Sequence, residues 1–545
     1  MARRAVLLFV LLAVVYGLSA GLRASRGAAI TGDEPFYLLT TQSLLEDGDL
    51  DLRQQYRRHS YRAFFDHPDG LWMQSVPTPD GRILSPHNPG LSVLLIPGFA
   101  LGGLRGAQLE LQLLAALTFT LVYVWVARVT GEARWSAWAT LAVALSATPF
   151  VYATEIYPEV PAALALVGLL LLLERAQPAA PGRRAATPPD EPAEAGRGQP
   201  GPAGPEEPAG AGRGESVPPE PGPDEPAGAG AGRPAPAPAT GARGEVAWAL
   251  AVALLLAVLM WLGIKYAPLA LPVAAVAFWR LGRRGRWTLA LAGVALAVPY
   301  VAFHLLVFGA LTPYSVNVVW AGASTPEVLQ AHVTDLANRF YRLWGLFVDR
   351  RFGLVRWAPV LLLALAGLVV MARRRGTPRL ALVLILIQHL MAVFVAITMM
   401  GWWFPGRTVM TVLPLYVLGL ALALQRGGRW ARAAFVPLAL GSLAVTAALV
   451  RSVGLGQVTV AVDPFAMPVG WFQALGRVFP DYRAWTLPTT VLTGLWLAVL
   501  ALLGGWGWRL GRPELLDASS GPEPWSPARR AGSRRARPRA ASPAR

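Results

Sequence analysis

Long stretches without charge recur along the whole chain and constrain its fold more than any other feature. A membrane-spanning helix needs roughly 20 apolar residues, and most of these stretches come close to that length. With 54% hydrophobic residues among 545 and a mean hydropathy of +0.43, an ordinary soluble domain is excluded. We predict an all-α polytopic membrane protein with about 12 transmembrane helices. The runs are 5–22, 111–127, 135–154, 156–173, 246–264, 266–279, 287–308, 357–372, 380–400, 408–425, 433–450 and 486–508.

The placement of the arginines predicts the orientation of these helices. A net charge of +17 could suggest a nucleic-acid partner, but most arginines lie in short loops between the apolar runs. Cytoplasmic loops of membrane proteins are enriched in Arg and Lys. If the N-terminus is inside, a single orientation places every basic cluster in the cytoplasm, which predicts a multi-pass protein of the plasma (inner) membrane with no nucleic-acid partner. These clusters are Arg3/Arg4, Arg128/Arg134, Arg280–Arg286, Arg373–Arg375, Arg426–Arg432 and the tail Arg529–Arg545.

The same rule interprets three doubtful segments. Counting Leu91–Leu104 as a span would move all later clusters outside, so this segment is predicted to be interfacial or re-entrant. A single helix over 246–279 would expose Arg280–Arg286, so a tight hairpin near Lys265 is expected, with this lysine at the outer face. For the first run, a cleaved signal peptide is the alternative.

Residues 176–244 are rich in Pro, Gly, Ala, Arg and Glu and show no apolar periodicity. Such a segment cannot bury enough surface to fold, so a disordered cytoplasmic loop is expected, either an inert insertion or a partner-binding segment. It separates an N-terminal membrane block (1–175, with the first outer loop) from a C-terminal membrane block (245–510). Residues 511–545 are predicted to be a basic, disordered cytoplasmic tail. The chain has no cysteine, which excludes disulfides and thiolate chemistry.

Lys265 is the one lysine among 49 basic residues. Arginine has replaced lysine wherever either serves, so this lysine marks a position where a compact point charge is needed and a planar guanidinium is unsuitable. The alternative is a chance survivor that extends its ammonium group to the interface.

Acidic residues gather on the predicted outer face. Asp33 and Glu34 follow the first apolar run, and Glu155 and Glu159 flank Tyr157 at the outer start of the fourth. Ionisable residues near membrane depth usually face a cavity and need partners. The structural alternative for Asp33 is a helix N-cap with a proline in the first turn, and for the others ordinary interfacial capping.

Two more outer segments carry polar or aromatic groups. Ser85–Gly90 contains His87, and Gly401–Arg407 combines Trp402 and Trp403 with a fixed cation, Arg407. An arginine beside aromatic rings suits a phosphate group. The alternative for the tryptophans is an aromatic belt at the membrane interface.

With these motifs the sequence resembles the GT-C superfamily of membrane glycosyltransferases. It is particularly similar to the family 39 branch, which contains protein O-mannosyltransferases and the aminoarabinose transferase of lipid A. The resemblance covers most of the chain apart from the predicted disordered segments. Its motifs are Gly32–Leu38, Asp47–Leu52, His87–Gly90, Tyr157–Glu159, Asp349–Leu354 and the Arg407 segment.

This resemblance implies an outward-facing active site under a long first loop, here about Arg23–Pro89. It also implies a polyprenyl-phosphate-linked sugar donor and an inverting transfer to a lipid, protein or polysaccharide acceptor. Asp33 is then expected to be the base, with a pKa raised by the low-dielectric site, and Glu34 to orient it or the acceptor. Positive charge for the departing phosphate is expected from Lys265, Arg407 or a divalent cation.

Further site residues follow from the same resemblance. His87, Glu155 and Glu159 are candidate ligands of the cation, and Tyr37, Tyr157, Trp402 and Trp403 are expected to line the cavity. Relatives often carry an acidic-lysine-proline stretch at the end of the first loop, whereas this chain has His87–Asn88–Pro89. Either Lys265 supplies that charge or donor recognition differs. The main alternative function is a transporter or flippase of a lipid-linked sugar, although no internal repeat is visible.

Overall fold

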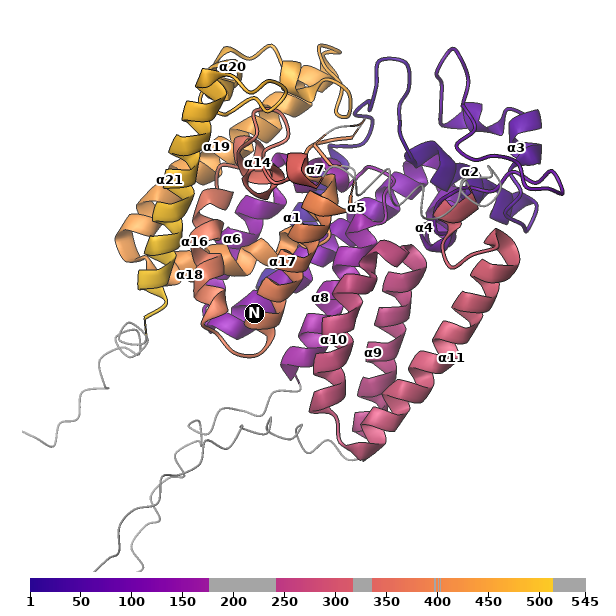
Figure 1. The fold of residues 1–545 in the computed structure, drawn as a ribbon, viewed down its shortest axis with the longest axis horizontal. Coiled ribbons are helices and arrows are strands. Elements are labelled where there is room, and N and C mark those ends of the chain that lie inside the picture. Colours follow the sequence, from indigo (N-terminus) through magenta and orange to yellow (C-terminus); the bar gives the residue numbers. More distant parts are fainter. Residues whose placement is uncertain (176–241, 317–335, 397, 400, 402, 513–545) are drawn as a thin grey trace, which may run out of the picture.

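The computed structural model describes residues 1–175, 242–316 and 336–512, except residues 397, 400 and 402 (Figure 1). Throughout these ranges the regular structure is helical. The predicted disordered loop and tail fall almost entirely outside the described residues; residues 242–244 of the loop begin a helix. The all-α prediction is confirmed.

Six helices are long and apolar enough to cross a membrane, and two shorter apolar helices, Leu361–Ala372 and Leu413–Arg426, accompany them among the described residues. The chain is therefore a multi-pass membrane protein. Each predicted run overlaps one of the helices below, but the count of twelve crossings stays a prediction. The helices are α1 (Ala2–Gly17), α5 (Ile96–Thr130), α6 (Ala133–Ala144), α8 (Glu159–Arg175), α9 (Ala242–Leu262), α10 (Ala267–Arg280), α11 (Arg283–Phe308), α16 (Leu361–Ala372), α17 (Thr377–Phe394), α18 (Tyr416–Arg426), α19 (Gly428–Gly454) and α21 (Leu487–Leu510).

The segment between α4 (Gly90–Leu94) and the body of α5 is not a separate long helix. Its backbone leaves the helical region at Gly102 (φ −157°, ψ 23°) and Gly103 (φ 54°, ψ −137°). Glycine adopts such angles at little cost, so the chain folds back here. The structure thus agrees with the prediction that Leu91–Leu104 is no independent span.

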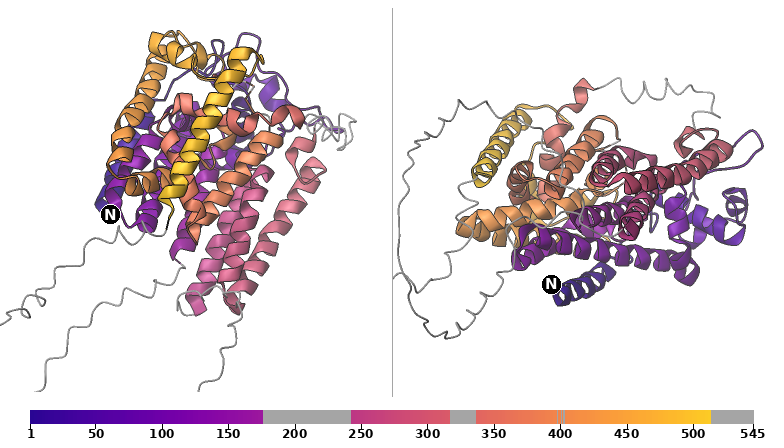
Figure 2. Two further views of the ribbon diagram at one scale, coloured as in Figure 1. Left: turned by 60° about the vertical axis from the view of Figure 1, so that its left-hand side comes forward. Right: turned by 90° about the horizontal axis from the view of Figure 1, so that it is seen from below.

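The predicted hairpin near Lys265 is confirmed. Helix α9 ends at Leu262, a short 3₁₀ turn covers Ile264–Tyr266, and α10 runs back from Ala267. Helices α9, α10 and α11 lie side by side in Figure 1 and in both views of Figure 2. The run 135–154, in contrast, is divided, because Ser146 and Pro149 are typical of a helix start and begin α7 (Ala147–Tyr152).

The basic turns meet at one end of the bundle. Arg280 closes α10 and donates a hydrogen bond to the carbonyl of Leu173 near the end of α8 (2.6 Å). Arg426 ends α18 and bonds the carbonyl of Leu510 at the end of α21 (3.1 Å). The N-terminus of α1 lies towards this end as well (Figure 1). The contacts therefore support the prediction from the charge pattern that the basic clusters lie on the same side of the membrane.

The first loop covers the opposite end of the bundle. It contains α2 (Glu34–Glu46) and α3 (Arg53–Arg57) and leads into α4, all drawn in indigo and violet in Figure 1. The later segments α14 (Arg342–Val348), α15 (Leu354–Trp357) and α20 (Gly470–Gly476) lie at this end too. The amides of Val460 and Ala461 donate to the carbonyls of Arg23 (3.0 Å) and Ala24 (3.1 Å), so both halves of the chain are joined here.

Candidate active site

The start of α2 places two carboxylates side by side but uses them differently. Asp33 occupies the N-cap position, yet its side chain makes no capping bond. Glu34 is buried, and its carboxylate accepts the amides of Thr31 (2.8 Å) and Ile156 (2.9 Å). Glu34 thus fastens the α2 turn to the α7–α8 connection, and this leaves the Asp33 carboxylate available for other partners.

Asp33 is instead held by three side chains from distant parts of the sequence. Arg407 Nη2 lies 2.6 Å from its Oδ2, and Gln74 Nε2 donates to its Oδ1 at 3.0 Å. His87 Nε2 lies 3.7 Å from Oδ1 and 2.8 Å from the amide oxygen of Gln74. The His87 ring also stacks on Tyr37, with 4.7 Å between ring centroids.

Arg407 is fixed by the turn that precedes it. Gly406 has φ +96°, a conformation that strongly favours glycine. The carbonyls of Phe404 and Pro405 accept hydrogen bonds from Tyr152 (2.6 Å) and Thr148 (3.1 Å). The guanidinium lies 3.9 Å from the ring centre of Tyr157 and 5.0 Å from that of Trp403, and only 11% of the side chain is exposed. This environment fixes the cation at one point.

Glu159 joins the two cations of the site. Its Oε1 lies 2.7 Å from Lys265 Nζ and 3.6 Å from Arg407 Nε. Lys265 remains 47% exposed, whereas the Glu159 side chain is 5% exposed. The lysine and the arginine thus converge on one carboxylate, with the lysine open to an incoming group.

The site and the basic turns occupy opposite ends of the same helices. Glu159 begins α8, Lys265 lies two residues before α10, and Arg407 precedes α18, whereas Arg280 and Arg426 end α10 and α18. The fourteen residues of α10 alone separate Lys265 from Arg280 by about 20 Å.

Burial and neighbouring charges shift the pKa values of the three carboxylates in different directions. Burial by itself raises the pKa of Asp33, but the charges of Arg407 and His87 and the bonds from Arg407 and Gln74 outweigh it and hold that pKa well below its ordinary value. Burial raises the pKa of Glu34 to about 7, against its two backbone bonds. Burial also raises the pKa of Glu155 well above its ordinary value, reinforced by the charge of Glu34. Asp33 is therefore ionised, and the expectation of a raised pKa for Asp33 is wrong for the free site.

The candidate metal ligands are not brought together. His87 faces Gln74 and Asp33, Glu159 faces Lys265, and both oxygens of the buried Glu155 lack a hydrogen-bond partner. Within the described residues no group of three or more His, Asp or Glu side chains is arranged to hold a metal ion. These residues therefore do not fit a cation site.

Most of the predicted site residues nevertheless converge. Asp33, His87, Tyr157, Glu159, Lys265, Trp403 and Arg407 form one network, with Tyr37 stacked on it; Trp402 lies outside the described residues. Gln74 was missed. A single glutamine in a long loop carries no sequence signal of its role.

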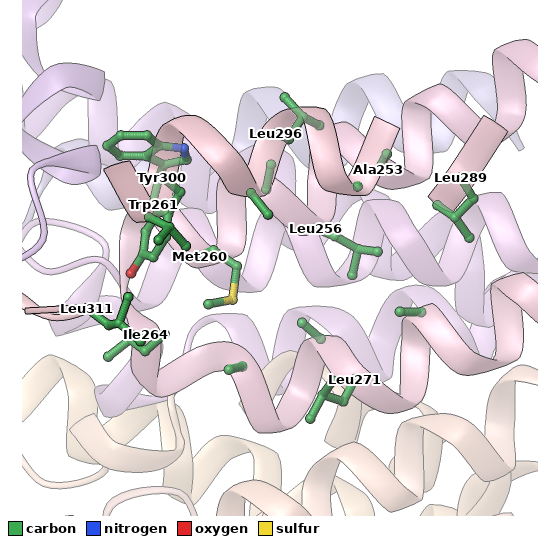
Figure 3. A pocket seen from close by; sticks show the side chains of 17 residues that line it. Ala253, Leu256, Met260, Trp261, Ile264, Leu271, Leu289, Leu296, Tyr300 and Leu311 are labelled. Atoms are coloured by element: carbon green, nitrogen blue, oxygen red, sulfur yellow. The ribbon is translucent and has the colours of Figure 1, made fainter. Parts of the chain in front are cut away.

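An apolar groove of about 470 Å³ runs between α9, α10 and α11 (Figure 3). On α11 its wall is formed by Leu289, Gly293, Leu296 and Tyr300, which are spaced three and four residues apart and so share one face. One end of the groove contains Tyr300, Trp261 and Ile264, and Ile264 directly precedes Lys265. The groove therefore begins beside the charged site and descends along the membrane-spanning helices.

The fold and this network define a multi-pass membrane protein with a buried, ion-paired carboxylate site at one end of its helical bundle. No protein-family model matches the chain, and no curated protein sequence matches it. Among solved structures it is similar to ArnT from Cupriavidus metallidurans bound to undecaprenyl phosphate, with 14% identity over 93% of this chain and 78% of that chain and a TM-score of 0.45. For ArnT in the apo state the identity and coverage are the same and the TM-score is 0.36.

Proposed function

We propose that the protein is an integral membrane glycosyltransferase. It transfers a sugar from a polyprenyl-phosphate-linked donor to a lipid, protein or polysaccharide acceptor, with inversion, on the extracytoplasmic side of the plasma membrane. The observation that carries the proposal is the Asp33–Arg407–Glu159–Lys265 network, in which the partly exposed Asp33 carboxylate pairs with Arg407, and Glu159 joins Arg407 to Lys265. Because this network lies opposite the basic turns, the positive-inside rule supports an extracytoplasmic site.

The network supplies a base on one side and phosphate-binding charge on the other. The acceptor hydroxyl gives its proton to Asp33 while its oxygen forms a bond to the anomeric carbon. The bond between that carbon and the phosphate oxygen breaks, and its electron pair leaves with the polyprenyl phosphate. Fixed cations stabilise the negative charge that develops there, a role that suits Arg407 and Lys265.

The same contacts explain how a strongly ionised carboxylate can act as a base. In the free site Arg407 depresses the pKa of Asp33, so Asp33 binds a proton weakly. As charge builds on the departing phosphate, that phosphate offsets part of the positive charge of Arg407 that acts on Asp33. Asp33 then becomes more basic as the acceptor proton is transferred.

The groove between α9, α10 and α11 is where we place the polyprenyl chain of the donor. Its α11 wall from Leu289 to Tyr300 covers about 17 Å, close to half of the roughly 30 Å hydrocarbon thickness. It lies within the membrane-spanning helices, where the surrounding solvent is hydrocarbon, and starts one residue from Lys265. A phosphate at Lys265 would therefore have an apolar exit for its tail.

The donor-chain placement predicts an effect that depends on chain length. No atom lies within 4 Å of a Cβ built on Gly293, so Gly293→Leu should fold and fill the groove. We expect the KM for a long-chain donor to rise about tenfold, the effect of displacing two methylene groups at about 0.8 kcal/mol each. The KM for a donor with a short, water-soluble chain should not change.

Gly494→Leu on α21 is the matched control, because a Cβ there also meets no atom within 4 Å. It should leave both KM values unchanged. Equal effects of Gly293→Leu on long and short donors, or none on either, would remove the chain from this groove.

Lys265→Arg tests the need for a compact charge. We expect the KM for the donor to rise several-fold, because the broader, planar guanidinium cannot occupy the place of the compact ammonium beside Glu159. Steady-state kinetics with the donor varied would measure it. The control is Arg26→Lys, the reverse change at an arginine whose side chain is 75% exposed. An unchanged KM in Lys265→Arg would mean that the lysine has no special role.

The proposed function is tested by incubating purified protein in lipid nanodiscs with labelled polyprenyl-phosphate sugars and a membrane extract. Label on an acceptor supports the transferase. Movement of intact donor between leaflets of a proteoliposome, without transfer, would instead establish the flippase alternative.

A further inference from the structure

The loop Ser85–Gly90 is bound to the membrane helices at a point next to the active site. Asn88 is buried, and its Nδ2 lies 3.2 Å from Nε2 of His304 and 3.4 Å from the hydroxyl of Tyr300, both on α11. At Gly90 the backbone packs against the carbonyl of Trp261 on α9 so closely that any Cβ would collide with it. These contacts therefore hold the loop in one position against α9 and α11.

The hydrogen bonds of His304 define its tautomer. Nδ1 lies 2.8 Å from the carbonyl of Tyr300, which can only accept, so Nδ1 carries the proton. Nε2 is then an acceptor for the Asn88 amide. His304 is completely buried, and its ring lies among Trp261, Phe303 and Phe308. A histidine whose two ring nitrogens are both engaged in this way is an oriented acceptor at a fixed position.

His87, the residue before Asn88, links this loop to the active site. His87 Nε2 donates to the amide oxygen of Gln74 (2.8 Å), and the Gln74 amide donates to Asp33 Oδ1 (3.0 Å). Because Arg407 holds the other oxygen, Oδ2, the orientation of the carboxylate depends on both partners. A displacement of the loop would release the Oδ1 side alone.

From this chain of contacts we propose that Asn88 and His304 are positioning residues for the transfer reaction. Their hydrogen bond holds the loop that carries His87 and thereby sets, through Gln74, the orientation of the Asp33 carboxylate. This rests on the proposed function. Neither residue lies among the groups that contact Asp33, so the effect is transmitted through His87.

The test combines Asn88→Leu, His304→Phe and the double variant. Each single variant is expected to lower kcat about threefold to tenfold, the value of one buried hydrogen bond, and to leave the KM for the donor unchanged because Arg407 and Lys265 are untouched. The double variant should be no slower than the slower single one, since both remove the same bond. His304→Gln, whose amide oxygen can accept from Asn88, should retain most of the activity.

The pH profile separates positioning from a merely structural role. Loss of the Gln74 bond removes a donor that favours ionised Asp33, so its pKa rises and the acid limb of kcat moves to higher pH. The titratable or charged groups that face Asp33 are Arg407, His87, Glu34, Tyr37 and Tyr157, and none of these is altered in the variants.

A readout without turnover keeps the test independent of the proposed function. Modification of His87 by diethyl pyrocarbonate, measured by mass spectrometry relative to His67, whose side chain is 39% exposed, should accelerate in both single variants. His389→Phe is the control, because His389, on the membrane helix α17, also bonds a backbone carbonyl (Leu343, 2.8 Å) but lies outside the network. Unchanged His87 labelling, or additive losses of kcat, would overturn the proposal. If the wild type transfers no sugar, the proposed function fails, and the labelling still decides the positioning role.

Discussion

Replacing Asp33 by asparagine is expected to reduce sugar transfer at least about a hundredfold, the usual contribution of a positioned base. Asparagine has nearly the same shape, and its amide oxygen can still accept from Gln74 or Arg407. It cannot take the acceptor proton, however. Transfer of labelled sugar should therefore disappear, while donor binding, measured by tryptophan fluorescence, and the thermal unfolding temperature stay close to the wild type.

Asp66→Asn is the matched control. Asp66 lies on the same first loop and pairs with an arginine, Arg23 (3.0 Å), but its side chain is 52% exposed. A surface pair of this kind contributes little, so transfer should be unchanged. Full transfer by Asp33→Asn would place the base elsewhere, and a collapse of its unfolding temperature would mean that the ion pair with Arg407 is mainly structural.

Arg407→Gln is the second large effect. The guanidinium contacts Asp33, Glu159 and the Tyr157 ring at once, so its loss removes both the phosphate charge and the partner of two carboxylates. We expect kcat to fall about 10² to 10³-fold and stability to fall by about 3 to 5 kcal/mol. Single-turnover kinetics and denaturant unfolding would measure the two effects separately.

The pH profile of Arg407→Gln should also change in a defined direction. Among the groups that lower the pKa of Asp33, the charge of Arg407 is the largest, so its removal raises this pKa. The carboxylate then ionises at a higher pH, and the acid limb of the remaining activity moves upwards. Arg350→Gln is the control: Arg350 lies 3.9 Å from Asp481 at the same end of the protein but outside the network. A profile identical to that of the wild type would contradict the assignment of Asp33 as the base.

Much of the site could be predicted because membrane insertion imposes a one-dimensional order on the chain. The apolar runs and the arginine clusters define which loops share a side. This order predicts that Asp33, Glu159, Lys265 and Arg407 lie at one end of the bundle, and the structure joins all four in one network. The hairpin at Lys265 followed from the same rule.

Other features could not be predicted because they depend on contacts across long stretches of sequence. Gln74 is 41 residues from Asp33, and nothing in its neighbourhood marks it. Asp33 does occupy the N-cap position of α2, as the alternative interpretation predicts, but its side chain makes no capping hydrogen bond. The carboxylate accepts instead from Arg407, 374 residues away. The expectation of a raised pKa considered burial without that cation, and the cation outweighs the burial.

The sequence by itself thus determined the class of fold and the end of the bundle where the charged groups meet, because hydropathy and charge decide how a helix enters a bilayer regardless of its neighbours. Only the tertiary structure decided that Asp33 is ionised, that Glu34 binds backbone amides, and that the loop carrying Asn88 is hydrogen-bonded to His304. These properties depend on distances of a few ångströms between helices, since hydrogen bonds form only at such distances and the attraction between opposite charges weakens as they separate.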